Sequence, residues 1–429
     1  MSLSLRSAAA WPFSLAVAAA VFSGQAALLG APIPPDRVLV ALGLGLVILG
    51  APIVARRGSE GLAARAEGIE AVHILLGLTL LWAVGSALFA GSLLEPDGFF
   101  ALFDSLGLIP FALFLVAPLV FRSERERRVL SAVLLVTGAY LGLTALFEAV
   151  GADALVFPKY ILDPAVGIHA ERARGPFVEA VANGLALYAC AVAALVSLSV
   201  WRSTALRVLA VGVAILCGLG IIFTLTRAIW LASVVASLVA LAADRRLRRF
   251  LVPSVAVAGV LVLVAVLLVS TLSQQAEQRA GDQLPLWDRL NTNAAAERMI
   301  AERPLFGFGW DRYSGANVDY LRQGEDYPLT GVGLDVHNVF LARAVELGLL
   351  GAALWLAAFL VAIGSPIVRG PPVFTPWRLG LLAIAVHWVI VANFGPLSYA
   401  FPTFLLWLWA GVVRAERREA PSLASMASS

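Results

Sequence analysis

The chain has 429 residues, of which 60% are hydrophobic and only 14% are charged. Soluble globular domains carry roughly a quarter of their residues as charged side chains, so this composition excludes a soluble enzyme and a disordered chain. The two cysteines lie within apolar runs and exclude a disulfide scaffold, and a net charge of only +3 gives no reason to expect a nucleic-acid partner. The composition predicts an integral membrane protein.

Twelve apolar stretches follow one another along the chain. Most are close to the roughly 20 residues that a helix needs to cross a bilayer. They predict an all-α integral membrane protein with 12 transmembrane helices, forming a single polytopic membrane domain over residues 1–429. The stretches cover residues 9–30, 37–55, 71–92, 99–121, 129–150, 181–201, 208–223, 228–243, 250–271, 338–365, 379–395 and 401–413.

Arginine-rich turns separate alternate pairs of these stretches and predict the orientation of the chain. Because such turns mark the cytoplasmic side of a membrane, both termini are expected in the cytoplasm. The longer connections, about 151–180 and 272–337, are then expected on the periplasmic side, and residues 420–429 as a disordered cytoplasmic tail. The turns are Arg56-Arg57 with Arg65, Arg122 to Arg128, Arg202 with Arg207, Arg245 to Arg249, Arg369 with Arg378, and Arg414 with Arg417 and Arg418.

The connection between the ninth and tenth stretches, residues 272–337, is long enough to carry a function. Apolar residues at helical spacing predict a helix from Leu286 to Arg303, which Pro304 ends. The following segment, Leu305 to Trp310, predicts a tight glycine-containing turn packed by aromatic side chains. The sequence therefore predicts a large, partly helical periplasmic loop.

His337 ends this loop where the tenth apolar helix is expected to begin. Asp335 is a suitable N-cap for that helix, whose first turn would present free N–H groups and the positive end of the helix dipole. Such a position favours an anion and lowers the pKa of a nearby histidine, so a neutral His337 could act as a general base. His73 and His387 lie inside apolar stretches and are expected to be hydrogen-bonded packing residues.

Two further arginines on the same side have little hydrophilic cover. Arg174 precedes the sixth stretch and Arg227 stands between the seventh and eighth, so each needs an anion, a water-filled cavity or lipid headgroups. Arg343 and Glu346 are three residues apart on one helix face and are expected to form a local ion pair.

The segment His337-Asn338, nine residues, then Gly348-Leu-Leu-Gly351 resembles the signature of the O-antigen ligase family. Small residues at four-residue spacing, Ala344, Gly348 and Ala352, also predict a surface for close helix packing. Other segments are similar to that family as well: Arg174 to Phe177 followed by Asn183, Thr226-Arg227, and Arg303 to Gly309.

The resemblance implies a glycosyltransferase in the bacterial inner membrane that uses no metal and no cofactor. It would transfer O-polysaccharide from undecaprenyl pyrophosphate to a sugar of the lipid A core at the periplasmic face, among membrane lipids and with inversion at the anomeric carbon. By the same resemblance His337 is the base, Arg174, Arg227 and Arg289 hold the diphosphate or donor, and Asn338 positions the acceptor.

Two alternatives remain open at the level of sequence. A related O-antigen polymerase would use the same lipid-linked donor but a lipid-linked glycan as acceptor. A flippase or transporter of lipid-linked oligosaccharides would also have twelve spans, but its ionisable residues should gather near the middle of the bilayer. The clear mid-span candidates are Asp104, His73 and His387, whereas the arginines and His337 gather at one face, which favours surface chemistry.

Overall fold

The computed structural model describes residues 5–57, 70–256, 259, 284–324, 327–369 and 373–426. Within these ranges helices are the only regular secondary structure. Seven helical segments are long and apolar enough to cross a membrane, and two shorter apolar helices accompany them. The seven are Ala10–Leu29, Ala71–Ala90, Pro96–Val120, Glu124–Val150, Ala180–Val200, Thr204–Phe223 and Val339–Val368; the two are Arg227–Ala243 and Pro376–Val391.

The described residues of the first half of the chain form a series of helices. They are α1 (Leu5–Ala8), α2 (Ala10–Ala19), η1 (Ala20–Leu29), α3 (Pro35–Arg57), α4 (Ala71–Ala90), η2 (Ser92–Leu94), α5 (Pro96–Ala101), the π-turn η3 (Leu102–Leu106), α6 (Leu108–Val120), α7 (Glu124–Val150), η4 (Asp153–Leu155), η5 (Lys159–Leu162), η6 (Gly175–Phe177) and α8 (Ala180–Val200).

The second half continues the bundle and adds the helices of the long connection. They are α9 (Thr204–Phe223), α10 (Arg227–Ala243), η7 (Arg248–Phe250), α13 (Leu284–Glu302), α14 (Tyr313–Ala316), η8 (Asn317–Tyr320), α15 (Val339–Phe359), the π-turn η9 (Leu360–Gly364), α16 (Ser365–Val368), α17 (Pro376–Val391) and α18 (Ala400–Met426).

These helices agree with most of the apolar stretches in the sequence. The stretch at 250–271 falls mostly outside the described residues, so the number of twelve spans stays a prediction. The helix expected over 286–303 is present as α13. Helix α18 continues to Met426, although the sequence predicts disorder from residue 420, and the disorder of the tail also stays a prediction.

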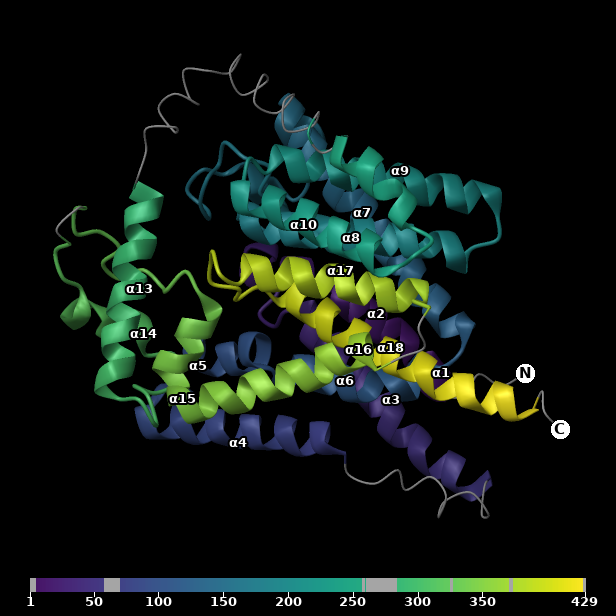
Figure 1. Cartoon of the computed structure of the whole chain (residues 1–429), viewed down its shortest axis with the longest axis horizontal. Coiled ribbons are helices and arrows are strands. Elements are labelled where there is room, and N and C mark those ends of the chain that lie inside the picture. Colours follow the sequence, from purple (N-terminus) through teal and green to yellow (C-terminus); the bar gives the residue numbers. More distant parts are fainter. Residues whose placement is uncertain are drawn as a thin grey trace.

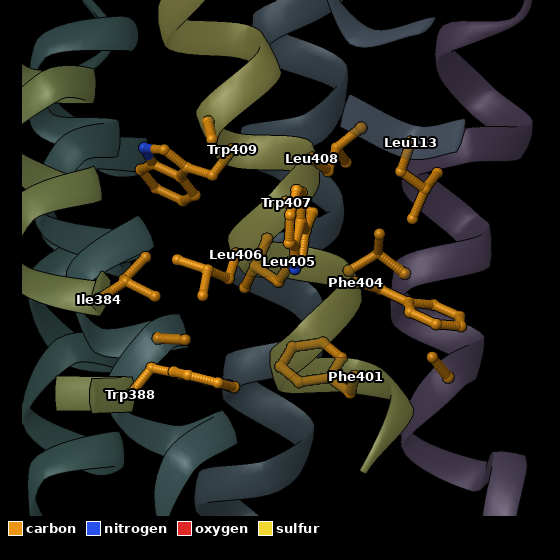
Figure 2. Close-up of a cluster of buried hydrophobic side chains, with 14 of the residues drawn as sticks. Leu113, Ile384, Trp388, Phe401, Phe404, Leu405, Leu406, Trp407, Leu408 and Trp409 are labelled. Carbon is orange, nitrogen blue, oxygen red and sulfur yellow. The ribbon is translucent and has the colours of Figure 1, made fainter. Parts of the chain in front are cut away.

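The core of the bundle lies around α18. Residues 401–413 of this helix are buried on every side, as expected for a helix that is apolar all round. Trp407 packs against Phe111 of α6 with ring centroids 4.8 Å apart, and the indole N–H of Trp409 donates to the carbonyl of Trp377 at 2.8 Å. Figure 2 shows this cluster, with the side chains of Phe401 to Trp409 surrounded by neighbouring helices.

The connections that the sequence places on one side of the membrane do meet at one end of the bundle, here called the loop end. The amide of Ala173 donates to the carbonyl of Phe223, and the amide of Val339 donates to the carbonyl of Ala392 at 2.9 Å. The hydroxyl of Ser92 donates to the carbonyl of Trp310 at 2.7 Å. Figure 1 shows α13 lying across this end, crosswise to α4 and α17.

Candidate active site

His337 lies at the loop end, immediately before α15. The residue that caps this helix is Asn338, whose Oδ1 accepts from the amides of Phe340 at 2.9 Å and Leu341 at 3.1 Å. The expectation that Asp335 is the N-cap is therefore wrong, because α15 begins three residues later than that cap requires. His337 still stands beside the start of a helix, as the sequence predicts.

Gly348 interrupts α15, which the sequence predicts to be continuous. Its φ of 69° and ψ of 173° are not helical, and a Cβ at this position would lie 2.2 Å from the carbonyl oxygen of Leu305. Only glycine adopts this conformation without steric cost. The direction of α15 changes at the break, so that its first turns stay at the loop end while the rest runs alongside α4 (Figure 1).

The glycine-containing turn that follows α13 fills this break. The amides of Phe308 and Gly309 donate to the carbonyls of Val345 and Glu346 at 2.8 and 3.0 Å, and the amide of Leu349 donates to the carbonyl of Pro304 at 2.7 Å. The backbone groups that the break leaves without helical partners are thus satisfied by the turn.

Helix α4 holds the other side of the break. The indole N–H of Trp82 donates to the carbonyl of Leu347 at 2.9 Å, and a Cβ at Gly351 would lie 2.3 Å from that indole nitrogen. The two glycines of the signature therefore have different tasks, since Gly348 allows the break and Gly351 admits Trp82. The small-residue surface predicted here is used by an indole and a turn as well as by helix packing.

The imidazole of His337 is half-buried. Its Nδ1 is buried without a hydrogen-bond partner among the described residues. Burial lowers the pKa of His337, and the positive charge of Arg289 lowers it further, while Asp288 and Asp335 act in the opposite direction. A neutral imidazole is suited to take a proton from a hydroxyl group.

Arg289 comes from α13 and is the predicted donor ligand that the structure brings within electrostatic range of His337. Its Nε is buried without a hydrogen-bond partner, and its guanidinium forms no ion pair among the described residues. The adjacent Asp288 is the charge that raises its pKa, against the lowering caused by burial. Arg289 is therefore a cation available to an anionic ligand beside His337.

Arg227 begins α10 at the loop end and is exposed. In the part of the chain that the structure describes, its guanidinium has no hydrogen bond or ion pair.

Helix α10 packs against α17, where Ser233 is 3.1 Å from Nε2 of His387. His387 also stacks on Tyr188, which confirms the prediction that it is a hydrogen-bonded packing residue. His73 instead caps the start of α4 and is exposed there, so its prediction as a packing residue is wrong.

Arg174 also lies at the loop end, but its side chain is only 1% exposed. Its guanidinium donates to the carbonyls of Ile161, Val166 and Asp163 at 2.5 to 3.0 Å. The amide of Arg174 donates to the carboxylate of Glu148 at 3.1 Å. Arg174 thus ties together the connection between α7 and α8, and its role as a donor ligand stays a prediction.

The first turns of α15 carry a buried ion pair. Nη1 of Arg343 is 3.0 Å from Oε2 of Glu346, as the spacing of the two residues predicts. The guanidinium also lies over the ring of Trp310, 4.6 Å from its centroid.

A polar cavity of about 70 Å³ opens beside this ion pair, and Val336, the residue before His337, lines it. Asp311 and Asp335 also line it, and the sequence singles out neither of them for a site. Burial raises the pKa of Asp311, and the negative charge of Asp335 is the largest of the neighbouring charges that add to this effect. The two residues are far apart in the chain, so only the fold reveals that they share a cavity.

Residues 212–356 match the family described as O-antigen ligase, a segment that contains Arg227, Arg289 and the whole His337 to Gly351 signature. Arg174 lies outside it. No curated protein matches the chain. The matched segment and the signature within it support an assignment to the O-antigen ligase family, and that family implies glycosyltransferase-type activity on lipid-linked polysaccharide.

Proposed function

We propose that this protein is an O-antigen ligase, which transfers O-polysaccharide from undecaprenyl pyrophosphate to a sugar of the lipid A core. The observation that carries the proposal is the pairing of His337 with Arg289. A half-buried histidine whose pKa is lowered lies within electrostatic range of an arginine that has no ion-pair partner among the described residues. Transfer from a diphosphate needs both a base for the acceptor and a cation for the leaving group.

In this proposal the reaction is a direct displacement. His337 takes the proton of the acceptor hydroxyl, the acceptor oxygen bonds to the anomeric carbon, and the bond between that carbon and the diphosphate oxygen breaks. The diphosphate leaves with the electron pair and is stabilised by Arg289. A single displacement of this kind inverts the anomeric centre and requires no metal.

The membrane part of the molecule supports a polyprenyl donor. An apolar cavity of about 670 Å³ lies among α8, α9 and α10, and its lining includes Leu219, Ile222 and Leu238. Trp230, one turn after Arg227, also lines it. We propose that the carrier chain lies in this cavity and that Arg227 holds the diphosphate at its loop end.

The other predicted ligands receive different support. Arg289 and Arg227 are supported as donor ligands by guanidinium groups without ion-pair partners in the described part of the chain. Arg174 has less support, because its guanidinium already donates to three carbonyls. Asn338 uses its Oδ1 to cap α15, and its Nδ2 donates to Oδ1 of Asn393 at 3.4 Å, so one amide N–H remains for an acceptor.

The proposed location is the bacterial inner membrane, with both termini in the cytoplasm and the loop end in the periplasm. The arginine-rich turns of the sequence support this orientation. Cysteine labelling in intact cells would test it: a cysteine at exposed Asp319 should react with an impermeant reagent, and one at exposed Arg207 should not.

The function itself is tested by reconstitution. Purified protein is mixed with undecaprenyl-pyrophosphate-linked glycan and rough lipopolysaccharide, with a chelator present, and the products are separated on a gel. Glycan joined to the lipid A core supports the ligase and its independence of metal. Longer glycan on the carrier would instead identify a polymerase. If substrates that are known to be active give no product, the alternative that the protein is a transporter is favoured. Product that disappears only with the chelator would contradict metal independence.

A further inference from the structure

His337 has charged neighbours of both signs. Arg289 of α13 and Asp335 both interact with it electrostatically. Asp335 also lines the cavity of about 70 Å³, here called the aspartate cavity, together with Asp311, Arg343, Glu346, Trp310 and Ser398 among others. These residues come from the turn after α13, the end of the loop, the first turns of α15 and the turn before α18.

The charge in the aspartate cavity comes from the two aspartates. Arg343 and Glu346 pair with each other at 3.0 Å, so their charges largely cancel. Asp311 and Asp335 form no ion pair and no side-chain hydrogen bond among the described residues. The cavity therefore offers free carboxylate oxygens, which accept hydrogen bonds.

The cavity also offers a donor. Nε of Arg343 is buried without a hydrogen-bond partner in the described residues, and the whole residue is only 8% exposed. A buried N–H group without a partner costs free energy until a ligand or water accepts from it. Trp310 and Tyr313, both almost fully buried, add aromatic walls.

This combination selects one class of ligand. Two carboxylates repel a diphosphate, so an anionic donor group is disfavoured here and is favoured on the side of Arg289. Sugar hydroxyls can donate to carboxylates and accept from an N–H group. At about 70 Å³, the cavity takes the hydroxyl-bearing edge of one sugar and not a whole oligosaccharide.

We propose that the aspartate cavity is the acceptor subsite, in which Asp311 and Asp335 hold hydroxyls of the core sugar that receives the glycan. This inference rests on the proposed function. It places the acceptor on one side of His337 and the donor diphosphate on the other. His337 then takes the proton from an acceptor hydroxyl that the aspartates orient, and the leaving diphosphate departs toward Arg289.

The test compares Asp311→Asn and Asp335→Asn with Asp319→Asn, an exposed aspartate of the same connection. Initial rates of transfer are measured while rough lipopolysaccharide and the lipid-linked donor are varied in turn. Loss of a hydrogen bond to a charged acceptor should raise the KM for lipopolysaccharide about tenfold in the first two variants. Their KM for the donor, and both constants of Asp319→Asn, should stay within about twofold of wild type.

A second variant guards against misfolding. Ser398→Leu adds a side chain at the exposed mouth of the cavity from a different segment, and it should also raise the KM for lipopolysaccharide. If Asp311→Asn and Asp335→Asn raise the KM for the donor instead, or change neither constant, the acceptor subsite is overturned.

A binding measurement separates this inference from the proposed function. Calorimetric titration of delipidated core oligosaccharide into the His337→Gln protein needs no turnover. Adding Asp311→Asn should weaken binding about tenfold. Equal binding by both proteins would overturn the subsite even where wild type is active. Weaker binding together with failed transfer by wild type would keep the subsite and overturn the ligase.

Discussion

Two connections at the loop end use arginine in opposite ways. In the connection between α7 and α8, Arg174 is buried and donates to three backbone carbonyls. In the connection that contains α13 and leads into α15, Arg289 lies within electrostatic range of His337 without an ion pair among the described residues. The comparison teaches that an arginine in a membrane protein indicates an anion site only when the protein itself provides no acceptor for the guanidinium group. The following predictions test this distinction.

The largest effect is expected from Arg174→Gln, and it should be an effect on folding. The shorter, neutral side chain leaves carbonyls of the connection without donors, at a cost of about 3 kcal/mol in the free energy of unfolding. Thermal unfolding in detergent should show a lower Tm, while the protein that remains folded should keep its KM for the donor. A raised KM for the donor at an unchanged Tm would show that Arg174 is a ligand after all.

Arg289→Gln should lower the rate of transfer and leave the Tm unchanged. Removing a cation that stabilises a leaving group typically costs about a hundredfold in rate, so kcat/KM for transfer should fall by about that factor. The Tm should not change, because the described residues give this guanidinium no hydrogen bond to lose. Arg298→Gln, an exposed residue of the same helix, is the matched control and should transfer at the wild-type rate.

Asn338→Ala tests whether this residue serves the fold or the acceptor. Loss of an N-cap side chain costs about 1 kcal/mol, so a slightly lower Tm with an unchanged KM for lipopolysaccharide is expected. Asn338→Asp keeps a capping oxygen and should restore the Tm. A raised KM for lipopolysaccharide in both variants would instead favour the acceptor role.

The smallest effect concerns pH. Because the pKa of His337 lies below its ordinary value, transfer should fall only at acidic pH, where the imidazole becomes protonated. Arg289→Gln removes a charge that lowers this pKa, so the pH below which transfer falls should move to a higher value. Asp288→Asn removes a charge that raises the pKa of His337, so the pH below which transfer falls should move to a lower value. If both variants shift the pH dependence in the same direction, the fall in transfer at acidic pH is not caused by protonation of His337.

Much of the fold could be predicted from the sequence, because hydropathy and helix length are local properties. The helix over Leu284–Glu302, the ion pair of Arg343 with Glu346, and the position of His337 before a helix all follow from short-range spacing. The break at Gly348 could not be predicted, because the residues around it keep an apolar helical pattern. It exists because the turn from Pro304 to Gly309 supplies hydrogen bonds from a distant part of the chain.

The candidate site was predictable only in part, for the same reason. The resemblance to a family indicated His337 and Arg227 by their positions in motifs, and it indicated Arg289 as one of several arginines in the loop. It could not distinguish Arg174 from them, because the carbonyls that occupy Arg174 belong to a connection with no regular pattern. Nor could it find the aspartate cavity, since Asp311 and Asp335 come together only when the loop folds against α15.

The measurement that tests the central claim most directly is transfer by wild type and His337→Gln in the same reconstituted membranes, with donor binding measured in parallel. Loss of a positioned general base typically costs about 10² to 10⁴ in rate, so His337→Gln should lose transfer to that extent. Its affinity for the lipid-linked donor and its Tm should remain those of wild type. Transfer at the wild-type rate by His337→Gln would contradict the account.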